Sequence, residues 1–136
     1  MTYVKNHLPE PIPNADSQHY LEMAIQENLV IRQCKKCSQK HFMPRYLCPN
    51  CWSDDLEWIK ASGNGIVHTY TIIRRPALQT FKQETPYVLA MIELEEGPRM
   101  IANVVGEGAL DIQINDCVKL VFESRGEYKL PQFEKA

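Results

Sequence analysis

The sequence predicts a mainly β protein that begins with one short helix, continues into a small metal-bound ribbon and ends in a closed five-stranded barrel. Three observations support this prediction. Two C-x-x-C pairs stand ten residues apart, an amphipathic stretch precedes them, and apolar runs separated by turns follow them. We expect three segments: an arm and helix over residues 1–28, the ribbon over 29–55 and the barrel over 56–136.

The first segment is expected to start as an extended arm. Prolines stand at positions 9, 11 and 13, and the first 15 residues show no hydrophobic period. Asp16 or Ser17 then stands where it can cap a helix. The apolar residues of that helix recur at helical spacing: Tyr20, Leu21, Met23, Ala24 and Ile25. Asn28 is expected to end the helix, because asparagine tolerates the left-handed conformation of a C′ residue.

Four cysteines form the most specific pattern in the chain, with Cys34 and Cys37 in one pair and Cys48 and Cys51 in the other. Two such pairs can surround one metal ion with four thiolates. Zinc is the default ion because it accepts tetrahedral sulfur coordination, although iron in a rubredoxin-like site is also chemically possible. Disulfides fit less well, since nothing indicates an oxidising compartment, and two pairs at this spacing suit a shared ion better than a redox motif. We therefore expect one structural zinc ion held by all four cysteines.

The ribbon is expected to follow from this metal site. Residues 29–32 form a short strand that leads into the first cysteine pair, and Gln39 to Tyr46 form a hairpin between the two pairs. His41 is expected to pack or to face solvent, because four cysteines already complete the shell. So small a module has little core of its own, so metal binding is expected to contribute most of its stability.

From Leu56 onward the pattern becomes one of short strands. After the run over residues 57–60, the expected barrel strands are 66–73, 87–94, 99–105, 118–123 and 128–130, separated by turns that contain glycine or proline. Five strands that close on themselves indicate an OB-like Greek-key barrel, which leaves no exposed edge. The fifth cysteine, Cys117, lies in an apolar run and is expected to be a small core residue.

Composition and charge limit the classes of ligand and partner that the chain is expected to bind. The chain has 136 residues, 44% of them hydrophobic, and a net charge of −2, which does not favour nucleic acid as a partner. Residues 32–53 nevertheless carry five cations and no acid, whereas residues 1–31 sum to −3 and residues 54–136 to −4. Such a basic ribbon suits a phosphate-bearing ligand or an acidic partner, or it offsets the charge of four thiolates. Without a membrane-length apolar run or a signal peptide, we expect a cytoplasmic protein.

An ordered set of motifs covers the chain from about Tyr20 to Phe133. These motifs are Cys34-x-x-Cys37, Pro44-Arg45, Cys48-Pro49-x-Cys51, Trp58, Gly63-x-Gly65-Ile66-Val67, Tyr70-Thr71, Arg75-Pro76, Pro86-Tyr87-Val88-Leu89-Ala90, Glu96-Gly97-Pro98-Arg99 and Leu130-Pro131-x-Phe133. In this order they resemble the zinc-ribbon OB-fold proteins associated with acyl-CoA metabolism, a family long catalogued as a domain of unknown function. The chain departs from the family at Ser38 and Trp52, which follow the cysteine pairs where glycine is usual, and at Asn28 and Asp116.

The resemblance implies a rubredoxin-like zinc ribbon followed by an OB-fold, and a non-catalytic role beside enzymes that act on acyl-CoA. The implied partners are thiolase-like, hydroxymethylglutaryl-CoA-synthase-like, hydratase or aldolase subunits, and the protein would bridge such subunits or help to hold CoA. The sequence leaves open the acyl group, the individual partner and whether the chain forms a homo-oligomer.

The residues agree with a non-catalytic role. The chain contains neither a G-x-S-x-G elbow nor an H-E-x-x-H helix, and a shell of four cysteines leaves no open position to activate water. Arginine and lysine suit the phosphates of CoA. The candidate CoA contacts are Arg45, Arg74, Arg75 and Lys82, which we expect to flank one cleft between the ribbon and the loop that ends at Pro86.

An alternative function is a module that binds single-stranded nucleic acid. OB barrels bind single strands through aromatic platforms in a basic groove, and Trp58, Tyr70 and Tyr87 are aromatic residues available for stacking. Against this, acidic residues are spread along the expected barrel strands. Nucleic-acid binding depends heavily on phosphate neutralisation, so this alternative is the weaker hypothesis.

Overall fold

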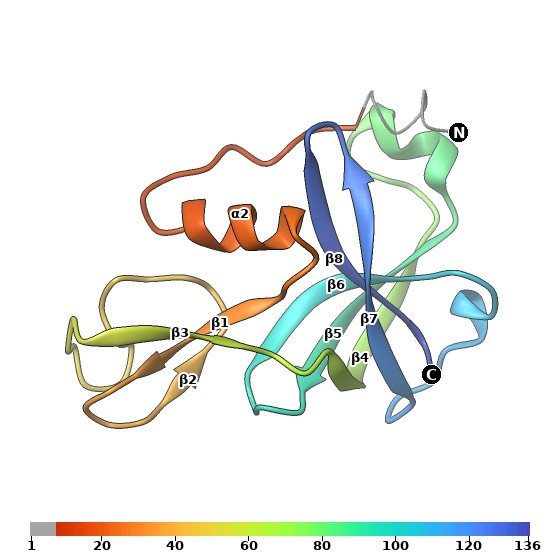
Figure 1. Cartoon of the computed structure of the whole chain (residues 1–136). Coiled ribbons are helices and arrows are strands. Elements are labelled where there is room, and N and C mark those ends of the chain that lie inside the picture. Colours follow the sequence, from red (N-terminus) through yellow and green to blue (C-terminus); the bar gives the residue numbers. More distant parts are fainter. Residues whose placement is uncertain (1–7) are drawn as a thin grey trace.

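The computed structural model describes residues 8–136, and the first seven residues of the expected arm lie outside the described part. A three-stranded sheet lies beside a five-stranded closed barrel, and one α-helix contacts both (Figure 1). The elements are α2 (Gln18–Ile25), β1 (Val30–Cys34), β2 (Lys40–His41), β3 (Leu56–Lys60), β4 (Asn64–Ile73), η1 (Gln79–Glu84), β5 (Tyr87–Leu94), β6 (Arg99–Val105), η2 (Ala109–Asp111), β7 (Cys117–Arg125) and β8 (Tyr128–Lys135).

The expected helix is α2, with Ser17 as its N-cap residue. The Ser17 side chain does not cap the helix. Its hydroxyl accepts a hydrogen bond from the Asn14 backbone N–H at 3.0 Å, and the Asn14 side chain accepts one from the Ser17 N–H at 2.9 Å. The end of the helix differs from the prediction, because Glu27 has the left-handed φ of 61° that we expected at Asn28. The helix therefore stops one residue early.

The ribbon sheet has the order β2-β1-β3, with both pairs antiparallel. The expected hairpin over residues 39–46 is absent from it. Only Lys40 and His41 form a strand, and they pair with Gln33 and Arg32 of β1 instead of folding back on the residues that follow. β3 pairs with β1 along its whole length, so the run over 56–60, which we expected to begin the barrel unit, belongs to the ribbon sheet.

Aromatic contacts join α2 to the ribbon. The Trp58 ring on β3 lies between His19 of α2, at a centroid distance of 4.9 Å, and the guanidinium of Arg32, at 4.3 Å from the ring. Tyr20 packs edge-on against Phe42 at 5.6 Å. A cation over an aromatic face and an edge-to-face pair each add to the energy of area burial. The helix is therefore fastened to the ribbon.

The barrel has the strand order β4-β5-β6-β8-β7, and β7 pairs with β4 to close it. All pairs are antiparallel except β6 with β8, which run parallel. The five-stranded Greek-key barrel expected from the sequence is confirmed. The last strand is longer than predicted, because β8 continues through Pro131 to Lys135.

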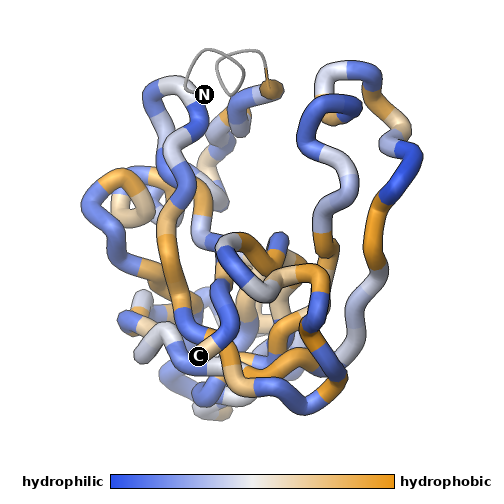
Figure 2. The backbone as a smooth tube through the Cα atoms, turned by 90° about the vertical axis from the view of Figure 1, so that its right-hand side faces the viewer, coloured by the Kyte–Doolittle hydropathy of each residue, from blue (hydrophilic) through white to orange (hydrophobic). Residues whose placement is uncertain are grey.

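The ribbon and the barrel share one hydrophobic core. Leu29 and Ile31, at the start of the ribbon, are almost completely buried in the same cluster as Val67, Ile92 and Phe133 of the barrel. Hydrophobic and hydrophilic residues alternate along the barrel strands, as expected when one face of each strand is buried (Figure 2). The ribbon is therefore stabilised in part by packing against the barrel.

Cys117 is not the core residue expected from the sequence. It is exposed at the first position of β7, and the next residue, Val118, is 2% exposed and points inward. Because successive side chains on a strand face opposite sides, the apolar run could not place both residues inside.

A pair of amide side chains completes the barrel where backbone pairing is short. β6 and β8 pair only at Val104 with Phe133 and at Val105 with Glu134. Beyond these pairs, the buried Gln132 side chain accepts a hydrogen bond from the Asn103 backbone N–H at 2.7 Å, and its amide donates to the Asn103 side-chain oxygen at 3.3 Å. The Asn103 amide in turn donates to the carbonyl of Val88 on β5 at 2.9 Å. These bonds link three neighbouring strands.

We predict that Gln132→Leu destabilises the protein by about 1–3 kcal/mol, because it leaves the partly buried Asn103 N–H without its hydrogen-bond partner. Urea unfolding measures the change. Gln113→Leu is the matched control, since Gln113 is exposed in the loop before β7, and it should change stability by less than about 0.5 kcal/mol. Equal effects of the two substitutions would contradict the role of the amide pair.

Candidate metal centre

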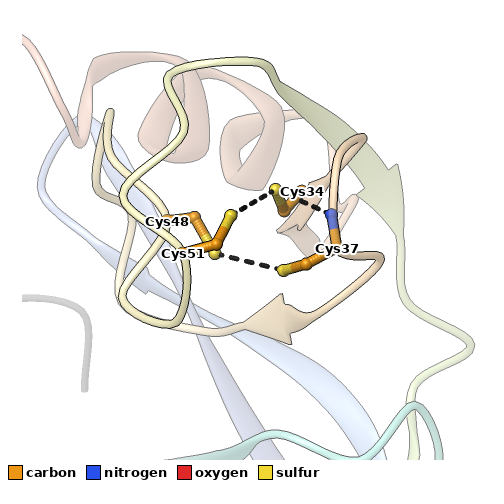
Figure 3. A group of neighbouring side chains, drawn as sticks. All are labelled: Cys34, Cys37, Cys48 and Cys51. Carbon is orange, nitrogen blue, oxygen red and sulfur yellow. Dashed lines mark hydrogen bonds between the residues drawn. The ribbon is translucent and has the colours of Figure 1, made fainter.

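Four sulfur atoms converge at the end of the ribbon sheet (Figure 3). The Sγ atoms of Cys34, Cys37, Cys48 and Cys51 lie within 4.8 Å of one another, and the Cys34–Cys51 and Cys37–Cys48 pairs are 3.6 Å apart. All four cysteines are free, since a disulfide would require about 2.05 Å. A tetrahedral ion with metal–sulfur bonds of about 2.3 Å needs sulfur separations of about 3.8 Å. The cluster therefore fits one metal ion.

Each cysteine pair sits on a turn of the same form. The first sulfur of each pair accepts a hydrogen bond from the backbone N–H two residues later, from Lys36 to Cys34 at 3.3 Å and from Asn50 to Cys48 at 3.4 Å. Cys37 also donates its backbone N–H to Cys34 Sγ at 3.4 Å. Donors aimed at sulfur favour the thiolate that a metal ligand must be.

The residue after each pair has left-handed backbone geometry. Ser38 has a φ of 66° and Trp52 a φ of 67°, and their N–H groups donate to the carbonyls of Cys34 and Cys48, both at 2.9 Å. Glycine would adopt this conformation freely, whereas a side chain costs about 1–2 kcal/mol. Ser38 and Trp52 therefore adopt the left-handed backbone that glycine would have at these positions, and their side chains add the steric cost that glycine would avoid.

The four thiols do not ionise alike. The Asn50 side-chain amide, which lies 3.6 Å from Cys37 Sγ, and the backbone N–H of Gln39 lower the pKa of the Cys37 thiol to about 6. Although the backbone N–H of Ser53 acts to lower it, the pKa of Cys51 rises to about 11, through desolvation and hydrogen bonds with the other three sulfurs. Four negative sulfurs repel one another at this distance, which opposes the ionisation of all four thiols. A bound cation would offset this repulsion.

His41 lies outside the four-sulfur group. Burial, together with the positive charges of Arg32 and Arg45, lowers its pKa, so the ring is neutral near pH 7. The prediction that the shell consists of cysteines alone is consistent with this placement and remains to be tested by metal binding.

The candidate phosphate contacts do not gather in one place. Arg45 is exposed on the ribbon, whereas Arg74, Arg75 and Lys82 are exposed on the loop from the end of β4 through η1. The ribbon and this loop lie at opposite ends of the molecule (Figure 1). The single cleft that we expected between them is therefore not formed. The hollow beside η1 is instead lined by three acids, Glu84, Asp111 and Glu123.

The aromatic residues of the nucleic-acid alternative are also dispersed. Trp58 is in the ribbon sheet under Arg32, Tyr70 packs against the barrel core, and Tyr87 contacts Phe81 of η1 at 6.2 Å. They do not form one stacking platform.

No sequence pattern indicated that Arg125, next to a turn glycine, is a buried residue. It is 7% exposed, pairs with Glu123 at 2.8 Å, and donates to the carbonyl of Pro9 at 3.1 Å. Its guanidinium also lies 5.8 Å from the Phe81 ring. The residue ties the N-terminal arm and η1 to the end of β7.

Comparison with known proteins identifies both units. Residues 24–57 match the family described as "ChsH2, rubredoxin-like zinc ribbon domain", and residues 58–123 match "ChsH2, C-terminal OB-fold domain". A solved structure described as "Ltp2-ChsH2(DUF35) aldolase" superposes with a TM-score of 0.83 and 35% sequence identity, over 93% of this chain and 98% of that one.

Three relatives carry informative names. A "Probable enoyl-CoA hydratase alpha subunit" of Thermomonospora curvata is 37% identical over 94% of this chain, which spans only 40% of the length of that protein. A "DUF35 domain-containing scaffold protein" of Methanothermobacter thermautotrophicus is 40% identical over 70% of this chain and 71% of that protein. "Benzoylsuccinyl-CoA thiolase subunit BbsA" of Geobacter metallireducens is 35% identical over 55% of this chain and 49% of that protein.

We predict that Cys48→Ser lowers the metal content well below one ion per chain and destabilises the protein by at least about 3 kcal/mol, because a ligand of a closed shell is lost. Elemental analysis and thermal unfolding measure the two effects. Cys117→Ser is the matched control, because Cys117 is an exposed cysteine outside the cluster and should leave both quantities unchanged. A wild-type chain that is folded but metal-free would contradict the assignment.

Proposed function

The chain belongs to the ChsH2/DUF35 family, and on that premise we propose that it is a scaffold subunit that holds an acyl-CoA-processing enzyme in an assembly and leaves the chemistry to that enzyme. The observation that carries this proposal is the match over nearly the whole chain to one chain of an aldolase complex. The names of the relatives add a hydratase subunit, a thiolase subunit and a scaffold protein. The proposed partner is therefore a thiolase-like, aldolase or hydratase enzyme.

The chemistry of the described residues supports a scaffold. Within residues 8–136, the four cysteines are the one group of three or more metal-binding side chains. Four sulfur ligands complete a tetrahedral shell, so such an ion supplies structure and has no free position for a substrate. We propose zinc as that ion, held by Cys34, Cys37, Cys48 and Cys51, because tetrahedral sulfur coordination suits it.

None of the helices in the described part of the chain combines the length and apolarity that crossing a bilayer requires. The phosphates of CoA would not suit the acidic hollow beside η1. We therefore propose that Arg74, Arg75 and Lys82 meet CoA only where the partner enzyme completes the site, and that Arg45 is separate from them.

Co-purification tests the scaffold proposal. We expect the full chain, expressed at its native level, to be isolated with an acyl-CoA enzyme in a fixed stoichiometry, and that enzyme to lose activity when the chain is removed. Acyl-CoA turnover by the purified chain alone, or isolation without any such enzyme, would contradict the proposal.

Calorimetry tests the CoA contacts. We expect CoA to bind the complex and not the free chain, and Arg75→Ala to raise the Kd of the complex by about threefold to tenfold, because one phosphate contact is lost. Lys119→Ala is the matched control for the loss of one cation, because Lys119 pairs with Glu134 and lies near the start of β7, whereas the end of β7 contacts η1. Tight binding of CoA to the free chain would show that the chain holds a complete site of its own.

A further inference from the structure

Trp52 combines two features that rarely occur together. Its backbone is left-handed, with a φ of 67°, and its side chain is 75% exposed. A bulky residue at positive φ is a genuine outlier, and outliers of this kind cluster at functional sites. Within the described residues, no aromatic or cation–π contact involves the Trp52 ring. The folded chain thus carries the steric cost of this side chain and gains little from its burial.

Ser38 shows that the backbone does not need the indole. It occupies the equivalent position after the first cysteine pair, with almost the same φ and the same hydrogen bond back to the first cysteine of its pair. A small residue therefore satisfies the turn. The large ring at position 52 must be explained by something other than the fold of the turn.

Two other exposed apolar residues lie in the same loop. Residues 42–53, which we call the ribbon-tip loop, contain no helix or strand and are fastened by Cys48 and Cys51. Within this loop Met43 is 63% exposed and Tyr46 is 65% exposed. The loop belongs to the ribbon, at the end of the molecule away from the barrel (Figure 1). Aromatic residues and methionine are enriched at protein–protein interfaces, and tryptophan and tyrosine at their hot spots.

The ribbon-tip loop and the residues that lead into it carry a net positive charge, although the exposed acids Asp54 and Asp55 follow the loop directly. Residues 32–53 contain five cations and no acid. Lys35, Lys36 and Arg45 are exposed, and none of the ion pairs found among residues 8–136 involves them. Even when four thiolates around a divalent ion contribute −2, the segment keeps a net positive charge. The complementary partner surface is therefore acidic.

We propose that Trp52, with Met43 and Tyr46, anchors the ribbon-tip loop in an apolar pocket bordered by acids on the partner enzyme. This inference rests on the proposed scaffold function and names the surface that performs it. A single strand of nucleic acid needs cations along a groove to neutralise its phosphates, whereas this chain has few cations on the ribbon and is acidic elsewhere. A protein partner therefore suits the site better than nucleic acid.

The decisive comparison is Trp52→Gly with Ser38→Gly, both made in the full, metal-loaded chain. The two substitutions relieve the same left-handed backbone, but only the first removes a large side chain. The partner that co-purifies with the wild-type chain is produced separately, and its Kd for each variant is measured by biolayer interferometry. We expect Trp52→Gly to raise the Kd by at least about tenfold while its Tm stays within about 4 °C of wild type or rises. Ser38→Gly should leave the Kd unchanged.

Two additional measurements complete the test. Tyr46→Ser, away from the left-handed position, should raise the Kd severalfold with the metal content intact, which guards against a folding defect in the Trp52 variant. The wild-type Kd should also rise as sodium chloride increases from about 0.05 to about 0.5 M, because opposite charges attract less strongly.

The outcomes separate the inference from the scaffold proposal. If no acyl-CoA enzyme co-purifies, the scaffold proposal and this inference both fail. If a partner binds wild type and Trp52→Gly equally, only the inference fails. Trp52-dependent binding of a single-stranded oligo-deoxythymidine, without loss of partner binding in the variant, would also overturn it.

Discussion

The structure depends on the convergence of four sulfur atoms from two turns. Each turn directs backbone N–H groups at its first sulfur, and the two turns bring the sulfurs to separations that suit a tetrahedral ion. Without a cation the four thiols are not all ionised near pH 7, because desolvation and the neighbouring sulfurs raise the pKa of Cys51 while hydrogen bonds lower that of Cys37. A bound ion would therefore fix the loop between β2 and β3, which has no strand pairing of its own.

The metal site does not act alone, because the ribbon is also part of the barrel core. Leu29 and Ile31 precede the first cysteine pair and are buried with barrel residues, while Trp58 is held between α2 and β1. An ion pair of 2.6 Å between Glu27 and Lys129 links the end of α2 to β8. Burial thus fixes the base of the ribbon, and an ion bound by the four sulfurs would fix its tip. Together, the buried base and a bound ion would hold an exposed loop rigid at a distance from the hydrophobic core.

Much of this arrangement could be predicted from the sequence, because the relevant signals are local. The cysteine spacing predicted the cluster, and the apolar runs separated by turns with glycine or proline predicted the barrel strands. The errors arose where contacts between residues far apart in the sequence determine which residues form a strand. Lys40 and His41 pair with β1 and not with the following residues, and Pro131 lies inside a strand, opposite Phe122. The separation of the ribbon, which carries Arg45, from the loop after β4, which carries Arg74, also depends on how the ribbon packs on the barrel, and no local pattern predicts this packing.

A rigid tip has a thermodynamic consequence for a scaffold. Association requires that interface side chains and loops be ordered, and that ordering reduces the affinity that a given contact area can provide. A loop that a bound ion would hold through Cys48 and Cys51, and that has a backbone hydrogen bond from Trp52 to Cys48, would be ordered before any partner arrives. The strain of the left-handed backbone at Trp52 then belongs to the free protein and does not have to be created on binding. Storing this cost during folding lets a small exposed surface bind more tightly than its area alone would allow.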